Sequence, residues 1–219
     1  MKDAASVEFV SPGIWLQLSA VGPKAPQAAL FLDRDGVIVE DPGYLSKPED
    51  VRLVAGVTTL ISAANAADVP VIVVTNQSGI ARGFFDWEDF TSVQQEIEHQ
   101  LSAEGVRLSA AVACPFHPDF SDDYAASLEG WRKPGPKMIQ LAAERLNIDV
   151  RRSALVGDHL TDIAAASAAG LSGGVIVLTG HGRTHAKDAA SVNRPGFKVA
   201  IADGPGMAIQ PLQEFGLPI

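Results

Sequence analysis

Residues 28–37 read Ala28-Ala29-Leu30-Phe31-Leu32-Asp33-Arg34-Asp35-Gly36-Val37. An apolar run of this kind is typical of a strand that is buried on both faces of a parallel sheet. The run ends in two aspartates and a glycine, and open parallel sheets bind their ligands at the carboxyl ends of their strands. Two carboxylates so close together need a cation or a shared proton. The stretch therefore predicts a central strand that delivers Asp33 and Asp35 to a site, with a solvated Asp-Gly turn as the alternative.

Three later segments carry residues suited to a phosphate and a metal ion. In chain order they are Val71-Ile72-Val73-Val74-Thr75-Asn76, Arg132-Lys133-Pro134, and Leu155-Val156-Gly157-Asp158 with Asp162 beyond it. The first and the third are apolar strands that end in polar residues, as the opening stretch does. A hydroxyl, an ammonium group and a further carboxylate at one sheet edge can hold phosphate oxygens and a hard cation.

Together the four motifs, which run in order from Leu30 to Gly180, resemble those of the haloacid dehalogenase (HAD) superfamily of phosphohydrolases. The alternation of strands and helices by itself predicts an α/β fold, with an open, mainly parallel sheet and helices on both faces. The resemblance implies that this is a Rossmann-like HAD core. Little sequence separates Gly36 from the first helix and no long block follows Thr75, so we expect no large cap domain. The expected organisation is an N-terminal extension over residues 1–27 and a phosphatase domain over residues 28–219.

Hydrophobic periodicity and turn residues predict the remaining elements. Helices are expected over residues 56–67, between the cap Asp86 and Gly105, over 136–146 and over 162–169, with a frayed helix over 206–215. Strands are expected over residues 71–74, 110–113, 154–156, 175–178 and 199–202. Residues 7–10 and 14–18 predict either a small hairpin or a loosely docked tail.

The composition narrows the class of partner. The chain has 219 residues and a formal net charge of −9, which argues against nucleic acid or an anionic membrane as partner. No stretch approaches the roughly 20 apolar residues of a membrane helix, and the first residues do not form the apolar core expected of a secretory signal. The single cysteine, Cys114, excludes an internal disulfide and fits a reducing compartment. We therefore expect a cytoplasmic protein, and the resemblance implies a small phosphorylated substrate.

The resemblance implies a role for each motif residue. Asp33 would be the nucleophile that forms an aspartyl phosphate, and Asp35 the general acid that later activates water as a base. Thr75 and Lys133 would hold the phosphoryl oxygens. Magnesium would be bound by the Asp33 carboxylate, the Asp35 main-chain carbonyl and Asp158. Asp162 would support this shell from behind, or only cap its helix.

Within the superfamily the motifs are most similar to those of heptose-bisphosphate phosphatases, and less similar to those of histidinol phosphatases. This likeness implies substrate contacts from Asp41, Pro42, Gly43, Tyr44, Thr75, Asn76, Gln77, Ser78, Arg132 and Lys133. Arg132 could grip a distal phosphate with its guanidinium fork, or be an ordinary surface arginine.

Three features depart from the family pattern. Many relatives bind zinc through Cys-x-His and a later Cys-x-Cys, but here Phe116, Glu129 and Trp131 stand where one histidine and two cysteines would be. We therefore expect no zinc, and read Cys114 as a buried thiol and His117 as a loop imidazole. His159 replaces the lysine that is usual after the aspartate of the fourth motif, and residues 1–27 have no counterpart.

The sequence thus predicts a magnesium-dependent phosphatase that acts on a sugar phosphate, of the heptose-bisphosphate type. One alternative is a histidinol phosphatase or another HAD phosphatase of small molecules. An alternative of another class is a phosphate-binding protein without turnover. The complete set of Asp33, Asp35, Thr75, Lys133 and Asp158 argues against lost turnover, because drift would be expected to remove some of it.

Overall fold

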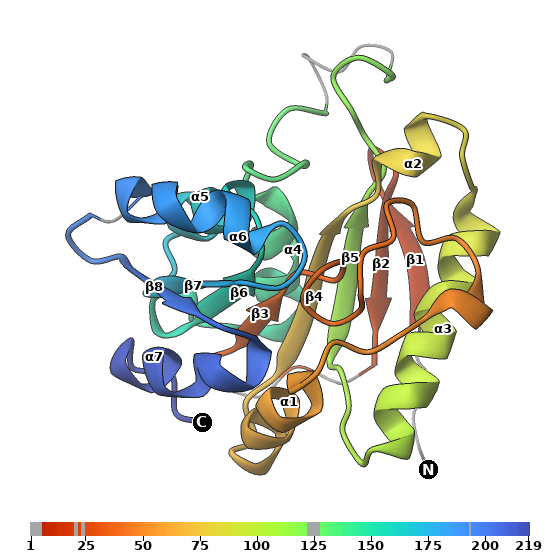
Figure 1. Ribbon diagram of the computed structural model, residues 1–219. Helices are drawn as coiled ribbons and strands as arrows, with labels where there is room; N and C mark the ends of the chain where they lie inside the picture. Colours follow the sequence, from red (N-terminus) through yellow and green to blue (C-terminus); the bar gives the residue numbers. More distant parts are fainter. Residues whose placement is uncertain (1–5, 20–21, 23–24, 122–127, 193) are drawn as a thin grey trace.

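The computed structural model describes residues 6–19, 22, 25–121, 128–192 and 194–219. In that part of the chain one eight-stranded sheet runs through the molecule, in the order β1-β2-β5-β4-β3-β6-β7-β8 (Figure 1). The six strands from β5 to β8 are parallel, whereas β1 and β2 are antiparallel to their neighbours. The bounds are β1 Ser6–Val10, β2 Ile14–Leu18, β3 Leu30–Leu32, β4 Val71–Asn76, β5 Ala110–Cys114, β6 Ala154–Gly157, β7 Gly173–Val177 and β8 Lys198–Ala202.

Strand β3 is the centre of this arrangement, as its apolar run predicts. It pairs with β4 on one side and with β6 on the other, and Leu32 lies level with Val73 and Val156. Its side chains alternate between the two faces of the sheet, with Leu30 and Leu32 in one hydrophobic cluster and Phe31 in the other. The carboxyl ends of the three central strands therefore meet at one edge.

Helices cover both faces of the sheet, which confirms the predicted layers. The first cluster contains residues of α1 (Val57–Ala66), α3 (Trp87–Ala103) and α7 (Ile209–Glu214). The second contains residues of α4 (Lys137–Leu146) and α5 (Leu160–Ala169). The segments 33–56 and 77–86 are described throughout and hold only the short turns η1 (Pro48–Asp50) and α2 (Ser78–Ala81), so neither forms a cap domain. The part of the chain that the structure describes has no helix that could cross a membrane.

The helix expected at 162–169 begins two residues earlier, at Leu160, because His159 caps it. The Thr161 main-chain N–H donates to His159 Nδ1 at 3.1 Å, and the His159 N–H donates to Asp162 Oδ2 at 2.9 Å. This reciprocal pair is a capping box, a role more often filled by a serine or threonine with a glutamate. Asp162 is thus fixed one turn into the helix, where its other oxygen is free to face the sheet edge.

The N-terminal segment forms the predicted hairpin, and the hairpin is part of the main sheet. Strand β2 pairs antiparallel with β5, with Leu16 level with Val112. Residues 14–16 are buried, and the Trp15 ring packs edge-on against Phe90 of α3 with 5.0 Å between ring centroids.

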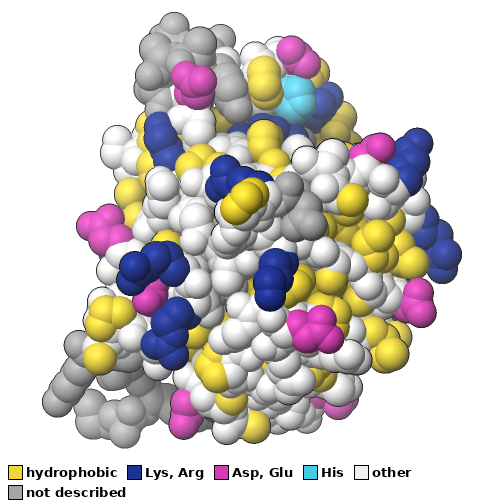
Figure 2. All heavy atoms as spheres, turned by 90° about the vertical axis from the view of Figure 1, so that its left-hand side faces the viewer, with side chains coloured by type: hydrophobic (Ala, Val, Ile, Leu, Met, Phe, Trp, Pro, Cys, Tyr) yellow, Lys and Arg dark blue, Asp and Glu magenta, His cyan; other side chains and the backbone are white. Residues whose placement is uncertain are grey.

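The face shown in Figure 2 carries interspersed acidic and basic side chains, without a patch of one sign among the described residues drawn there.

Candidate active site

The predicted motif residues meet in one pocket at the carboxyl edge of β3, β4 and β6. This cavity has a volume of about 570 Å³. All of the expected catalytic and metal-binding residues line it: Asp33, Asp35, Thr75, Lys133, Asp158 and Asp162. So do the expected substrate contacts, except that Pro42 is not among the lining residues: Asp41, Gly43, Tyr44, Asn76, Gln77, Ser78 and Arg132.

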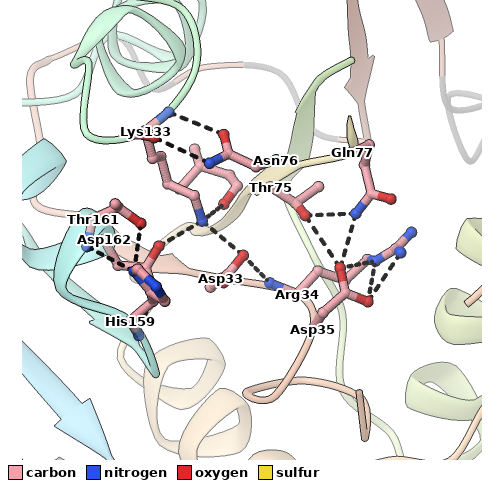
Figure 3. A network of polar contacts seen from close by, with 11 residues as sticks. Asp33, Arg34, Asp35, Thr75, Asn76, Gln77, Lys133, His159, Thr161 and Asp162 are labelled. Carbon is pink, nitrogen blue, oxygen red and sulfur yellow. Dashed lines mark hydrogen bonds and ion pairs between the residues drawn. The ribbon is translucent and has the colours of Figure 1, made fainter. Parts of the chain in front are cut away.

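Lys133 lies at the centre of this pocket (Figure 3). Its ammonium group is 2.7 Å from Asp33 Oδ1 and 2.7 Å from Asp162 Oδ1, and it donates to the Val74 carbonyl at 2.8 Å. Burial lowers the pKa of Lys133, but the two carboxylates raise it by more, so the net shift is upward and the amine stays charged. Its main chain is held as well, because Asn76 accepts from the Lys133 N–H at 3.0 Å and donates to its carbonyl at 3.2 Å.

Asp33 is the first residue after β3 and is almost completely enclosed. Its Oδ1 accepts from the Arg34 N–H at 2.7 Å in addition to its contact with Lys133. Burial raises the pKa of Asp33 well above its usual value; Lys133 opposes this shift, and the carboxylates of Asp162 and Asp158 add to it. A buried carboxylate surrounded by others is unfavourable unless positive charge is close by.

Asp158 sits in a space that two glycines leave open. A Cβ atom on Gly36 would lie 2.3 Å from Asp158 Oδ2, and one on Gly180 would lie 2.2 Å from it. The same oxygen accepts from the His181 N–H at 2.7 Å. Burial, together with the charge of Asp162, raises the pKa of Asp158 to about 6. The glycine after Asp35 is therefore required by a carboxylate that comes from a distant strand.

These residues fit a hard divalent cation. Asp33, Asp158 and Asp162 each offer an oxygen, and the three atoms lie within 4.8 Å of one another. Oxygen ligands at this spacing are those that magnesium uses in proteins. Lys133 faces two of the three carboxylates, and burial together with the mutual repulsion of the carboxylates raises the pKa of Asp33 and of Asp158, which a bound cation would offset. Asp162 caps α5, one of the two roles expected for it, and it also pairs with Lys133; its support of a magnesium shell stays a prediction.

Asp35 faces a different set of partners from Asp33. Its carboxylate accepts from the guanidinium of Arg34 and from the Gln77 amide, which donates at 2.8 Å, and Thr75 Oγ1 is 3.4 Å away. In Figure 3 Asp35 and Lys133 lie on opposite sides of Asp33. Asp33 is therefore paired with Lys133 on one side of the pocket. Asp35, on the other side, is held separately by Arg34 and Gln77.

Sequence reasoning missed several residues that line the pocket, among them Arg34 and His181. Arg34 is completely buried, and His181 both donates its N–H to Asp158 and places its Nε2 3.2 Å from Asp41 Oδ2. A signal existed for His181, because Thr179-Gly180-His181-Gly182 follows a parallel strand at the same sheet edge. Cys114 is fully buried, and burial raises the pKa of its thiol to about 12. The expectation that the protein binds no zinc stays a prediction.

The fold and this site together are those of a phosphatase of the HAD class. The sequence profile of the HAD-hydrolase-like family matches residues 130–201. The D-glycero-beta-D-manno-heptose-1,7-bisphosphate 7-phosphatase of Mesorhizobium japonicum is 39% identical over 194 residues, which are 87% of this chain and 84% of that protein. The chain belongs to the family of D-glycero-D-manno-heptose-1,7-bisphosphate 7-phosphatases within the HAD superfamily.

Two solved structures support this assignment. A HAD-like phosphatase from Mesorhizobium loti superimposes with a TM-score of 0.82 at 35% identity, over 96% of this chain and 97% of that one. The D,D-heptose 1,7-bisphosphate phosphatase of B. bronchiseptica, solved with magnesium and phosphate, superimposes with a TM-score of 0.73 at 32% identity. That match covers 86% of this chain and 99% of the other. The first match leaves only 4% of this chain uncovered, less than the 27 residues of the N-terminal extension, so part of the extension has a counterpart there and the expectation that it has none was wrong.

Proposed function

We propose that the protein hydrolyses the 7-phosphate of D-glycero-D-manno-heptose 1,7-bisphosphate with the help of magnesium. The observation that carries this proposal is the buried arrangement of Asp33, Lys133, Asp158 and Asp162 at the sheet edge of a chain in this family. A cytoplasmic location, expected from the single cysteine, remains part of the proposal.

The first chemical step is attack by Asp33 on phosphorus. Among the described residues the Arg34 N–H and the Lys133 ammonium group both contact Oδ1 of this carboxylate, which leaves Oδ2 for the attack. The new bond joins Oδ2 to phosphorus as the bond from phosphorus to the sugar oxygen breaks. Lys133 and the Thr75 hydroxyl would hold the phosphoryl oxygens and offset their charge.

Asp35 supplies the proton balance of both steps. It would donate a proton to the departing sugar oxygen, and then take a proton from the water that attacks the aspartyl phosphate. Magnesium, held by the carboxylates of Asp33 and Asp158 and the Asp35 main-chain carbonyl, would neutralise the charge of the phosphoryl group. Products are the free sugar hydroxyl, inorganic phosphate and an unchanged enzyme.

The pocket supports a substrate larger than phosphate alone. A volume of about 570 Å³ lies within the range of roughly 300–1,000 Å³ typical of sites for small organic ligands. Beyond the motif residues its walls carry Asp41, Tyr44 and Arg132, which offer groups for sugar hydroxyls, for a sugar face and for a second phosphate. Because the described residues form no cap domain over the site, these loops would select the substrate.

The experiment is phosphate release with magnesium from both anomers of the heptose bisphosphate, from heptose monophosphates and from histidinol phosphate. We expect the bisphosphate to be hydrolysed best, and Asp33→Asn to reduce release to background, because an amide does not attack phosphorus. Asp188→Asn, which changes an exposed aspartate outside the pocket, should retain wild-type turnover.

Three outcomes would contradict the proposal. Preference for histidinol phosphate over every sugar phosphate would reassign the substrate. Substantial turnover by a folded Asp33→Asn protein would remove Asp33 as the nucleophile, and no turnover of any phosphate by the wild type would favour a binding protein.

A further inference from the structure

Arg34 lies between the two motif aspartates and has no contact with solvent. Its side chain is 0% exposed, whereas the carboxylate it faces, Asp35, is 22% exposed. Arginine is almost never fully buried unless it is paired. Here Arg34 Nη2 is 3.0 Å from Asp35 Oδ1, and Nε is 3.2 Å from both carboxylate oxygens (Figure 3). The guanidinium also lies over the ring of Phe90, 5.0 Å from its centroid.

Gln77 completes the enclosure of the same carboxylate. Its amide donates to Asp35 Oδ2 at 2.8 Å and to the Thr75 hydroxyl at 2.8 Å, and the side chain is buried. Both oxygens of Asp35 therefore have donors that are themselves held by packing. A carboxylate in such a setting keeps one orientation, whereas an exposed aspartate samples several.

The arrangement is a costly way to stabilise a fold. Among the described residues Arg34 Nη1 has no hydrogen-bond partner, and an unsatisfied buried donor is unfavourable. Well-packed apolar residues often stabilise a protein as well as a buried ion pair does. Arg34 and Gln77 also contact Asp35 itself, the residue proposed as general acid, and the exposed part of Asp35 lines the pocket.

We propose that Arg34, assisted by Gln77, is a positioning residue that aims the Asp35 carboxyl group at the oxygen of the leaving group. This inference rests on the proposed role of Asp35 in the phosphatase reaction. In the step concerned, the bond between Asp33 and phosphorus forms and the bond from phosphorus to the sugar oxygen breaks. The electron pair of that bond stays on the sugar oxygen, which takes the proton of Asp35.

Leaving-group dependence separates positioning from general structural support. A sugar alkoxide needs a proton as it departs, whereas the p-nitrophenolate of p-nitrophenyl phosphate departs without one. The ratio kcat/KM reports only the steps up to departure of the leaving group, so the later use of Asp35 as a base does not enter it. A misplaced Asp35 should therefore harm the sugar substrate selectively.

The test compares kcat/KM of Arg34→Met on the heptose bisphosphate and on p-nitrophenyl phosphate. We expect a loss of about 10- to 100-fold on the sugar substrate, the value of a charge-assisted hydrogen bond, and of less than about 3-fold on the aryl phosphate. Arg34→Lys keeps the charge without the fork and should recover part of the loss. Gln77→Leu removes the second donor and should show the same selectivity, which keeps the test open if Arg34→Met does not fold.

Two further variants calibrate the result. Arg82→Met changes another arginine that lies over a ring, that of Phe120 at 4.2 Å, and should affect both substrates equally. Asp35→Asn should show the same selectivity as Arg34→Met, but to a larger degree. Suppose that Asp35→Asn harms the sugar substrate selectively, but that Arg34→Met and Gln77→Leu each reduce kcat/KM equally on both substrates. That result would overturn the positioning role of Arg34 and leave the proposed function intact. An unselective Asp35→Asn in an active wild-type background would instead overturn the acid role in the proposed function.

Discussion

Asp158 gives the site a pH dependence with a definite sign. Burial and Asp162 raise its pKa from 3.8 to about 6, so the folded protein without metal favours the protonated carboxyl group. Stability contributed by this proton is fully present below about pH 4 and is lost as pH rises to about 6. The pKa of Asp33 is raised in the same direction. Magnesium binds deprotonated carboxylates. It should therefore stabilise the folded protein most above about pH 6, where Asp158 is ionised and its negative charge is unfavourable.

We therefore predict that saturating magnesium raises the Tm more at about pH 7.5 than at about pH 5. Thermal unfolding monitored by fluorescence measures the shift, with sodium chloride at equal ionic strength as the control. Asp158→Asn should lose most of the magnesium effect at the higher pH. An equal rise in Tm at both pH values would show that these carboxylates do not bind the ion.

The motif aspartates and Lys133 could be predicted because each follows a recognisable local pattern. Arg34 and Gln77 could not be assigned to Asp35 in the same way. Their meeting depends on the register of β3 with β4, in which Leu32 lies level with Val73, and on the packing of the guanidinium over Phe90. No short sequence pattern encodes the contact between Gln77 and Asp35, which are 42 positions apart, and the packing that turns the neighbouring Arg34 toward Asp35 is equally a tertiary feature.

The turn after β3 has a conformation that its sequence explains only in part. An Asp-Gly pair indicates a positive φ, and Gly36 has φ of +81°. The structure adds a second reason for glycine, since the Asp158 carboxylate occupies the space of a side chain at this position.

The predicted start of α5 lies two residues too late in the chain, because histidine is an unusual helix cap. Within residues 37–44, Val39 forms isolated bridges to Asp35 and to Leu53.

Gly36→Ala should therefore be more damaging than its backbone angle alone predicts. Its Cβ would meet Asp158 Oδ2, so we expect weaker magnesium binding as well as a loss of stability above roughly 1–3 kcal/mol. Gly105→Ala is the matched control, because φ is +76° there and nothing lies within 4 Å of a Cβ. Urea unfolding and magnesium titration of the two variants measure the difference. Equal stability losses, with magnesium binding intact in both, would mean that Asp158 can move aside.

The layered architecture as a whole followed from the alternation of strands and helices, whereas the order of strands did not. Residues 110–114 are small and apolar, as suits either a central strand or one at the edge of the sheet. The structure covers this strand with β2, so that the first segment of the chain closes one side of a sheet whose centre is β3. A hairpin of alternating residues was predictable, but its place beside β5 depends on tertiary packing.

Trp15 tests how far the hairpin contributes to the stability of the molecule. It is 1% exposed and packs on Phe90, so Trp15→Ala should lower the free energy of unfolding by about 3–5 kcal/mol. Phe9→Ala on β1 is the control, because Phe9 is 57% exposed and should cost about 1 kcal/mol or less. Chemical denaturation measures both. A loss of 1 kcal/mol or less for Trp15→Ala would mean that the core folds independently of its N-terminal hairpin.

The pocket also unites parts of the chain that are made at very different times. Thr179 Oγ1 donates to the Gly36 carbonyl at 2.6 Å across 143 residues, and the Asp158 carboxylate fills the space between Gly36 and Gly180. Domains form from the N-terminus onward while the ribosome works. A nascent chain that has released β3 and β4 already carries Asp33, Asp35 and Thr75, yet lacks the lysine, the other carboxylates and half of the walls. We therefore expect an unfinished chain that ends before Asp158 and Gly180 to lack the complete site.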